Sequence, residues 1–156
     1  MKIYLAGRFG RQTELRVVRL ELSTMGFPVT SRWLDQQNPG DWPDGTPFEV
    51  LNNDPASVAP FAVRDMEDLL EADTMISFTD GAFEARGGRH VEFGLALALG
   101  KRMLIVGPRE NLFHTLGRVE HHPEWAGLAA QMECWCADSR DQLVVPPSYH
   151  RDRTDH

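Results

Sequence analysis

The stretch GGRHVEFGLALALGKRMLIVG, residues 87–107, predicts a helix that leads directly into a buried strand. Gly87 and Gly88 precede an apolar run that extends to Leu99 and contains one carboxylate, Glu92. The segment that follows, RMLIVG at 102–107, is apolar on both faces, which is typical of a strand in a sheet covered on both sides. A helix followed at once by such a strand favours an α/β fold with a parallel sheet.

Outside this stretch, strand-like runs alternate with segments of helical spacing. Strands are predicted at residues 2–7 (KIYLAG), 27–34 (FPVTSRWL), 74–79 (TMISFT), 102–107 and 132–137 (MECWCA), and helices at 13–25, 61–73, 87–100 and, as a short one, 111–116. We therefore expect one α/β domain over residues 1–147, with a doubly wound, Rossmann-like or flavodoxin-like parallel sheet of about five strands flanked by helices. Residues 148–156 are expected to form a polar C-terminal tail.

Apolar residues at helical spacing indicate which helix faces enter the core. The stripes are Leu15, Val18, Leu22 and Met25 in helix 13–25, and Val63, Met66, Leu69 and Leu70 in helix 61–73. In the late strand, Cys134 and Cys136 would point to the same face. They are too close together for an ordinary structural disulfide and lack zinc-finger spacing, so we expect a reduced, cytoplasmic protein.

The composition of the 156 residues argues against several classes of protein. Hydrophobic residues make up 42% and charged residues 25%, the usual balance of a globular domain. The formal net charge is −7 without a long basic run, which argues against binding to a nucleic-acid polymer. We expect no membrane span, because no run of about 18 apolar residues is present. The apolar stretch at the N-terminus, MKIYLAGRFG, is too short for a signal peptide.

Residues 35–60 interrupt the alternation with a segment of loop composition. The segment contains five prolines and many Asn, Asp and Gly residues. Irregular segments of this length in a small domain are usually either functional or disordered. Trp42 and Phe48 favour a functional segment, and we expect a lid or a pocket wall.

In a doubly wound sheet the ligand crevice lies beyond the carboxyl ends of the strands. Three loops therefore matter most, at residues 7–12, 79–90 and 107–114. The first, GRFGRQ, lacks the full G-x-G-x-x-G spacing of a dinucleotide loop. Arg8 and Arg11 lie near a predicted helix N-terminus, where they either hold a phosphate or sugar hydroxyl or are solvated residues of a glycine turn.

Glu92 is the main candidate for chemistry at this crevice. A glutamate in the first turn of a helix is stabilised as an anion by unpaired backbone N–H groups, so capping alone accounts for it. However, Gly87 and Gly88 would let a substrate approach the backbone closely, and an ionised carboxylate there suits a nucleophile that attacks a sugar anomeric carbon. Asp65 borders the apolar stripe of its helix, but spacing does not separate it from Asp68.

The histidines and the acidic residues near the crevice show no metal signature. His90, His114, His121 and His122 lack a recognisable metal-ligand spacing. Asp80 and Glu84 add carboxylates without the pattern of a divalent-metal site. We expect neither a metal ion nor another cofactor.

Four segments together resemble the nucleoside 2-deoxyribosyltransferase family: IYLAGRF, RDMEDLLEADTMIS, GGRHVEFGLALALGKRMLIVG and RENLFH, within about residues 2–116. The same superfamily includes 2′-deoxynucleoside 5′-monophosphate N-glycosidases, which hydrolyse rather than transfer. The resemblance implies a purine or pyrimidine salvage enzyme that cleaves the N-glycosidic bond of a 2′-deoxynucleoside through a covalent glycosyl-glutamate intermediate and passes the deoxyribose to another base. A monophosphate N-glycosidase and a non-catalytic nucleoside- or nucleotide-binding module are the alternatives.

The resemblance also implies roles for individual residues. Glu92 matches the nucleophile, and Asp65 matches an aspartate that places the sugar and the nucleophile or protonates the leaving base. Asn111 matches an asparagine that a neighbouring subunit contributes to the deoxyribose 5′-hydroxyl, which implies a homo-oligomer, a dimer or larger, with Asn111 shared across an interface. The other residues expected to bind the substrate are Gly7, Arg8, Phe9, Asp80, Gly87, Gly88, Arg89 and His90.

One position departs from the family pattern. Transferases of the family can carry a second aspartate, used to handle the base, six residues before the nucleophile, and this sequence has Arg86 there. Asp80 and Glu84, in the same loop, are the candidates to replace that aspartate. The basic residues available to hold a 5′-phosphate are Arg8, Arg11, Arg86, Arg89 and His90. Asn111 favours instead a substrate with a free 5′-hydroxyl.

Overall fold

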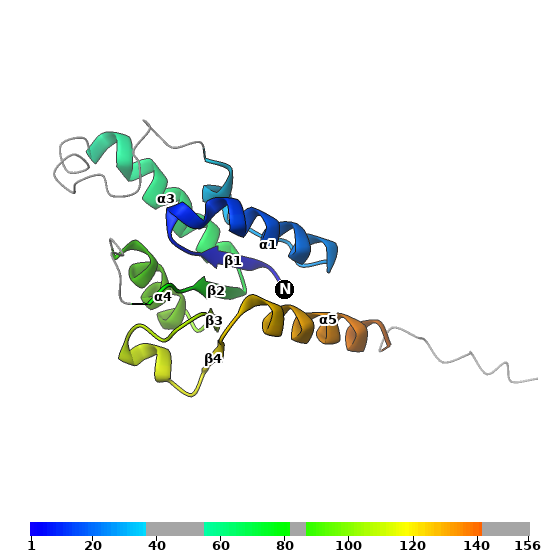
Figure 1. Ribbon diagram of the computed structural model, residues 1–156. Helices are drawn as coiled ribbons and strands as arrows, with labels where there is room; N and C mark the ends of the chain where they lie inside the picture. The colour runs from blue at the N-terminus through cyan, green and yellow to red at the C-terminus, as the bar shows by residue number, and fades with distance from the viewer. Residues whose placement is uncertain (37–54, 82–86, 142–156) are drawn as a thin grey trace, which may run out of the picture.

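Four parallel strands form the centre of the molecule (Figure 1). The computed structural model describes residues 1–36, 55–81 and 87–141. The strands lie side by side in chain order and all neighbours are parallel: β1 (Ile3–Ala6), β2 (Thr74–Phe78), β3 (Arg102–Val106) and β4 (Val119–His122). The first three confirm the strands predicted at 2–7, 74–79 and 102–107.

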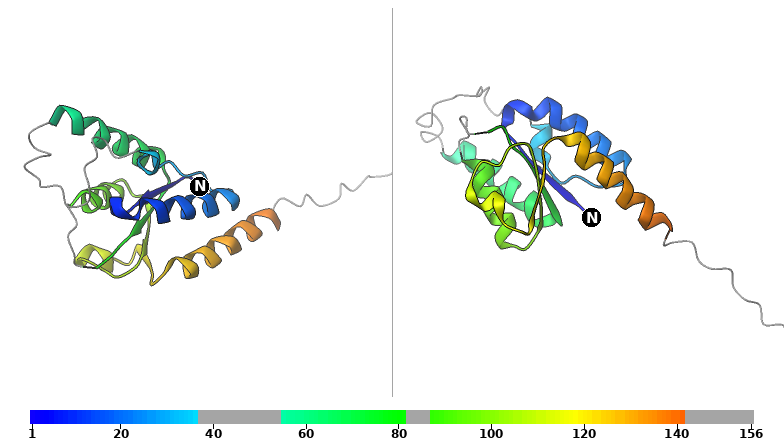
Figure 2. Two further views of the ribbon diagram at one scale, coloured as in Figure 1. Left: turned by 45° about the horizontal axis from the view of Figure 1, so that its top comes forward. Right: turned by 60° about the horizontal axis from the view of Figure 1, so that its bottom comes forward.

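Helices cover both faces of this sheet (Figures 1 and 2). One face carries α1 (Gln12–Thr24) and α5 (Trp125–Asp141), and the other carries α3 (Pro55–Glu71) and α4 (Gly88–Ala98). Three short 3₁₀ helices complete the described chain: η1 (Phe9–Arg11), η2 (Arg32–Asp35) and η3 (Leu112–Thr115). The prediction of a doubly wound α/β fold is therefore confirmed.

The strand predicted at residues 27–34 is wrong, so the sheet has four strands rather than about five. Backbone pairing with β1 is confined to an isolated parallel bridge between Val29 and Ile3: the Ile3 N–H donates to the Pro28 carbonyl, and the Ile3 carbonyl accepts from the Thr30 N–H, both at 2.9 Å. Further along, side chains rather than backbone groups satisfy Leu5: its N–H donates to Ser31 Oγ at 2.6 Å, and its carbonyl accepts from Trp33 Nε1 at 2.8 Å. The chain then turns into η2 and leaves the sheet.

The strand predicted at MECWCA is also wrong, because these residues lie in the middle of α5. Leu128 and Met132, one helical turn apart, are fully buried and hold α5 on the sheet. Cys134 is exposed, while the Cys136 thiol contacts the Met25 carbonyl at 3.1 Å. The last strand is instead β4, which the sequence patterns did not predict.

The predicted apolar stripe of α1 is confirmed, whereas that of α3 is mostly wrong. In α1, Leu15, Val18 and Leu22 are buried as predicted, and Met25 packs partly buried just beyond its end. Helix α3 begins before residue 61, and of its predicted stripe only Leu69 is buried. Val63, Met66 and Leu70 are each more than half exposed. The reason is a rotation of α3 that places two carboxylates, Asp65 and Asp68, on the inner side of the helix.

Several predicted features fall outside the described residues. They are most of the segment predicted as a lid or pocket wall (37–54), Glu84 and Arg86, and the predicted C-terminal tail (148–156). Among the described residues, no helix is long and apolar enough to cross a membrane.

Candidate active site

Glu92 lies in the second turn of α4, with its side chain directed to the sheet. Helix α4 begins at Gly88, after Gly87 in a left-handed conformation with φ of 83°. The alternative that Glu92 only caps the first turn is therefore excluded, because the first turn of α4 holds no acidic residue. Burial, and next the charge of Asp65, raise the pKa of Glu92 from 4.5 to about 7. Glu92 is thus a carboxyl that titrates near neutral pH rather than a stabilised anion.

Tyr4 is the direct partner of Glu92. Its hydroxyl donates to Glu92 Oε1 at 3.1 Å, although the two residues are 88 positions apart in the chain. Tyr4 is fully buried in β1, and burial and then the charge of Glu92 raise the pKa of its phenol. The phenol therefore stays protonated and is a permanent hydrogen-bond donor to the carboxylate.

Sequence reasoning missed Tyr4, and one signal was available. A hydroxyl in the middle of the apolar strand KIYLAG requires a buried partner, because an unpaired polar group in the core is costly. The sequence does not reveal which residue is that partner.

Asp65 is the second carboxyl of this group, which we call the Glu92 site (Tyr4, Asp65 and Glu92). Burial, and next the charge of Asp68, raise the pKa of Asp65 from 3.8 to about 6. Its Oδ1 is buried without a hydrogen-bond partner among the described residues. Asp68, by contrast, accepts from the backbone N–H of Arg32 at 2.7 Å and pairs with the Arg32 guanidinium. The structure thus separates the two carboxylates: Asp68 holds η2 in place, whereas Asp65 has a buried oxygen that none of the described residues binds.

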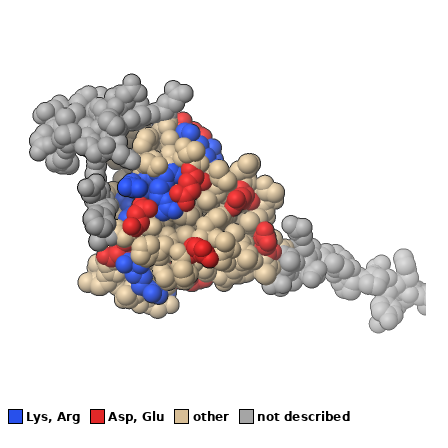
Figure 3. Space-filling view, viewed as in Figure 1, with Lys and Arg blue, Asp and Glu red and all other residues tan. Residues whose placement is uncertain are grey.

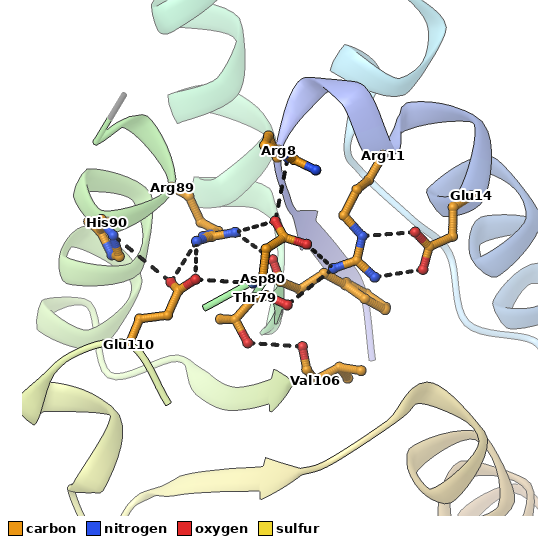
Figure 4. Close-up of polar contacts among 10 residues, drawn as sticks. Arg8, Arg11, Glu14, Thr79, Asp80, Arg89, His90, Val106 and Glu110 are labelled. Atoms are coloured by element: carbon orange, nitrogen blue, oxygen red, sulfur yellow. Dashed lines mark hydrogen bonds and ion pairs between the residues drawn. The ribbon is translucent and has the colours of Figure 1, made fainter. Parts of the chain in front are cut away.

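A second group of charged residues lies at the carboxyl ends of β1 and β2, and we call it the mouth cluster: Arg8, Arg11, Glu14, Asp80, Arg89 and Glu110 (Figure 4). Asp80 follows β2 and contacts three arginines, Arg8 at 3.6 Å, Arg11 at 3.1 Å and Arg89 at 3.3 Å. It borders a cavity of about 560 Å³ whose lining includes Arg8 and Arg11. The predicted crevice is therefore present, and it brings residues of three separate loops together.

Arg89 lies in α4, one turn before Glu92, and is 6% exposed. Its guanidinium donates to both oxygens of Glu110 and to the Phe78 carbonyl at 2.8 Å. These bonds join α4 to β2 and to the segment before η3. The same positive charge also lowers the pKa of Glu92, against the larger effect of burial.

Asn111 and two histidines lie at the other edge of α4. The Asn111 Oδ1 caps η3 by accepting from the Phe113 N–H at 2.9 Å. Its Nδ2 lies 3.1 Å from His114 Nε2 and 3.4 Å from His90 Nδ1. His114 is buried, and burial lowers its pKa, so the ring stays neutral at pH 7.

His90, Glu110 and His114 offer ligand atoms within 4.8 Å of one another, a grouping that spacing alone did not predict. Two contacts fill this donor set with protein groups. Arg89 already pairs with both oxygens of Glu110, and the Asn111 amide nitrogen faces both imidazoles. We therefore assign the set a structural role in holding η3 rather than a metal.

Phe9 and the glycines expected to bind the substrate also have structural roles or surroundings that can be described. A Cβ on Gly7 would lie 2.6 Å from Leu15 Cδ1, so a side chain at this position would require the buried Leu15 side chain of α1 to shift. The neighbouring Phe9 packs partly buried against the core, with its ring 6.4 Å from that of Trp33. Around Gly88 there is open space, consistent with an accessible start of α4.

Comparison with known proteins supports this architecture. No protein-family model matches the sequence, and no curated protein matches it significantly. Among solved structures, a 2-deoxyribosyltransferase from the psychrotolerant bacterium Bacillus psychrosaccharolyticus aligns with a TM-score of 0.60 and 21% identity, over 85% of this chain and 96% of that chain. The CMP N-glycosidase BcmB of Clostridium botulinum aligns with a TM-score of 0.56 and 17% identity, over 86% of this chain and 99% of that chain. At these identities the likeness establishes a shared fold along nearly the whole length of both proteins.

Proposed function

We propose that this protein is an enzyme that cleaves the N-glycosidic bond of 2′-deoxynucleosides and transfers the deoxyribose to a second base. The observation that carries the proposal is the Glu92 site. A buried carboxyl held by a buried phenol, next to a second carboxyl with one buried oxygen that lacks a hydrogen-bond partner among the described residues, is an arrangement suited to glycoside chemistry. Two solved structures that share this fold are those of a 2-deoxyribosyltransferase and a CMP N-glycosidase, enzymes that act on a deoxyribosyl group and on a nucleotide N-glycosidic bond.

In the proposed mechanism, ionised Glu92 attacks C1′ of the sugar through an oxocarbenium-like transition state. The Glu92 Oε–C1′ bond forms while the bond from C1′ to the base nitrogen breaks, and the base leaves with its electron pair. Tyr4 orients the carboxylate through its hydroxyl. Asp65, with a pKa of about 6, supplies or accepts the proton on the base. A second base then attacks C1′ and releases Glu92, with retention at the anomeric carbon.

The acceptor distinguishes transfer from hydrolysis. If water takes the place of the second base, the same intermediate yields free deoxyribose. The arginines of the mouth cluster are the groups that would hold the phosphate of a monophosphate substrate in the N-glycosidase alternative. A module that binds a nucleoside without base release is the remaining alternative.

The proposal includes a cytoplasmic homo-oligomer that functions in base salvage. Val63, Met66 and Leu70 leave an apolar stripe on α3 exposed, which a second subunit would cover. Asn111, which borders a separate cavity together with His90 and Phe93, would then contact the sugar bound by the neighbouring subunit.

The test is to incubate the protein with each of the four deoxynucleosides and their monophosphates, with and without a second base, and to follow free base and new nucleoside by chromatography. Glu92→Gln should reduce base release to background. Glu120→Gln, at an exposed pair with Arg102, is the matched control and should retain full activity. Base release by Glu92→Gln at close to the wild-type rate would exclude the proposed nucleophile.

A further inference from the structure

Asp80 occupies the centre of the mouth cluster and faces three guanidinium groups (Figure 4). Its Oδ1 accepts from Arg11 Nη1 at 3.1 Å, and its Oδ2 accepts from Arg89 Nη1 at 3.3 Å. Arg8 Nε lies 3.6 Å from the same Oδ2. Three arginines converging on one anion is the pattern that proteins use to hold a phosphate group. Here a carboxylate of the protein itself takes that place.

Most of the remaining donors of two of these arginines are also used, the exception being Arg89 Nε, which is buried without a hydrogen-bond partner among the described residues. Arg11 donates from Nε and Nη2 to the two oxygens of Glu14, at 2.8 and 2.6 Å, and from Nη1 to the Thr79 carbonyl at 3.3 Å. Arg89 pairs with both oxygens of Glu110 and is almost fully buried. Only Arg8, about half exposed, lacks a second carboxylate partner among the described residues.

The charges of the mouth cluster are therefore balanced. Its three guanidinium groups face three carboxylates, those of Glu14, Asp80 and Glu110. The space-filling view agrees, since basic and acidic side chains of the described residues lie intermixed on the face that it shows (Figure 3). A phosphate monoester would bring a charge of about −1.5 to −2 at pH 7 into this balanced group. To reach the arginines it would have to displace Asp80 and leave that carboxylate without its partners.

The mouth cluster is also close to the Glu92 site. Arg89 precedes Glu92 by three residues, close to one turn of α4, and its positive charge lowers the pKa of the Glu92 carboxyl. Arg89 also binds the Phe78 carbonyl at the end of β2, directly before the loop that holds Asp80. A substituent on a sugar held at Glu92 that extends beyond the strand ends would meet this cluster.

We propose that Asp80 is a specificity-determining residue that takes the place of a substrate phosphate, so that the site accepts nucleosides with an uncharged 5′ end and discriminates against 5′-monophosphates. This inference rests on the proposed function and selects between its two substrate classes. It gives Asp80 a role other than that of the missing base-handling aspartate.

The first test compares kcat/KM for base release from a deoxynucleoside and from its 5′-monophosphate. Wild type should favour the nucleoside by about tenfold or more, because the monophosphate must break charge-assisted hydrogen bonds. Asp80→Asn keeps the side-chain shape and removes the charge, and should shift the ratio at least about tenfold toward the monophosphate. Glu14→Gln is the matched control: it also removes one carboxylate, but one that is 52% exposed and, among the described residues, pairs only with Arg11, so the ratio should change less than about twofold.

A second measurement separates this inference from the proposed function. Calorimetric titration with the same nucleoside and monophosphate should show tighter binding of the nucleoside to wild type, and a gain in monophosphate affinity only in Asp80→Asn. If no substrate releases its base, the proposed function fails while these affinities still test the role of Asp80. The inference is overturned if wild type cleaves or binds the monophosphate as well as, or better than, the nucleoside. This comparison requires no variant. An equal shift in Asp80→Asn and Glu14→Gln also overturns it, because general charge would then be the cause.

Discussion

Tyr4 and Glu92 form a buried hydrogen-bonded pair, and the hydroxyl of Tyr4 opposes part of the rise in pKa that burial causes at the Glu92 carboxyl. The hydrogen bond from Tyr4 lowers the pKa of Glu92, while burial raises it to about 7. Tyr4→Phe removes the donor and keeps the ring that fills the core. The pKa of Glu92 should then rise further, so the acidic limb of the kcat/KM profile should move to higher pH, with a loss of roughly tenfold at pH 7. An unchanged acidic limb, measured across pH 5–9, would contradict this role of the phenol.

Glu92 should also reduce the stability of the folded protein at neutral pH. Its pKa is about 7 in the folded protein and 4.5 ordinarily, so between these values the folded state binds more protons than the unfolded chain. Stability therefore decreases as pH rises through this window, and the full cost is present above the folded pKa. Glu92→Gln should be more stable than wild type by about 2 kcal/mol at pH 8 and by less at pH 5. Urea unfolding at both pH values tests this independently of activity, and an equal difference at both would contradict it.

At the scale of elements, α3 carries two inward carboxylates with opposite expected effects on stability. Asp68 is buried and holds η2 through the Arg32 backbone N–H and guanidinium, so Asp68→Ala should lower the free energy of unfolding by about 2 kcal/mol. Asp65 has no hydrogen-bond partner at its buried Oδ1 among the described residues and has a raised pKa, so Asp65→Asn should leave stability unchanged or increase it while reducing base release. Urea unfolding of both variants at pH 7 checks this contrast, and the reverse order of stabilities would refute the assignment.

The elements that sequence predicts correctly here are those whose pattern is local. The buried strands β1, β2 and β3 and the helices α1 and α4 each have an apolar run or stripe within a few residues. The predicted strand at 27–34 failed because the side chains of Ser31 and Trp33, not a backbone ladder, bind the edge of β1. The predicted buried stripe of α3 is wrong because the helix faces the core with Asp68, and this orientation leaves Val63 and Met66 exposed.

In the candidate site, too, the features that the sequence predicts are local, and those that it does not predict depend on contacts between distant residues. The position of Glu92 in the helix between β2 and β3 follows from the strand order and the fold class, which a sequence pattern supplies. Its partner Tyr4 and the balanced charges around Asp80 depend on contacts between residues far apart in the chain. No pattern within one segment predicts such pairings, so the raised pKa of Glu92 and the role of Asp80 required the structure.

At the scale of the whole molecule, the proposed site is complete only when two subunits meet. In a dimer that shares Asn111 across its interface, each site would combine Glu92 of one subunit with Asn111 of the other. Asn111 also caps η3 in its own subunit, so a suitable variant must keep that cap. Asn111→Ser retains an oxygen that accepts from the Phe113 N–H and removes the longer amide.

Complementation between two impaired variants tests this arrangement. Glu92→Gln and Asn111→Ser should each be nearly inactive as pure oligomers. After unfolding and refolding together, mixed dimers would contain one site with both native residues, and activity should return to about a quarter of the wild-type value. Refolding each variant alone is the control and should restore nothing. If the mixture stays as inactive as its components while co-purification through an affinity tag on one variant shows mixed oligomers, Asn111 acts within its own subunit and the shared site is refuted.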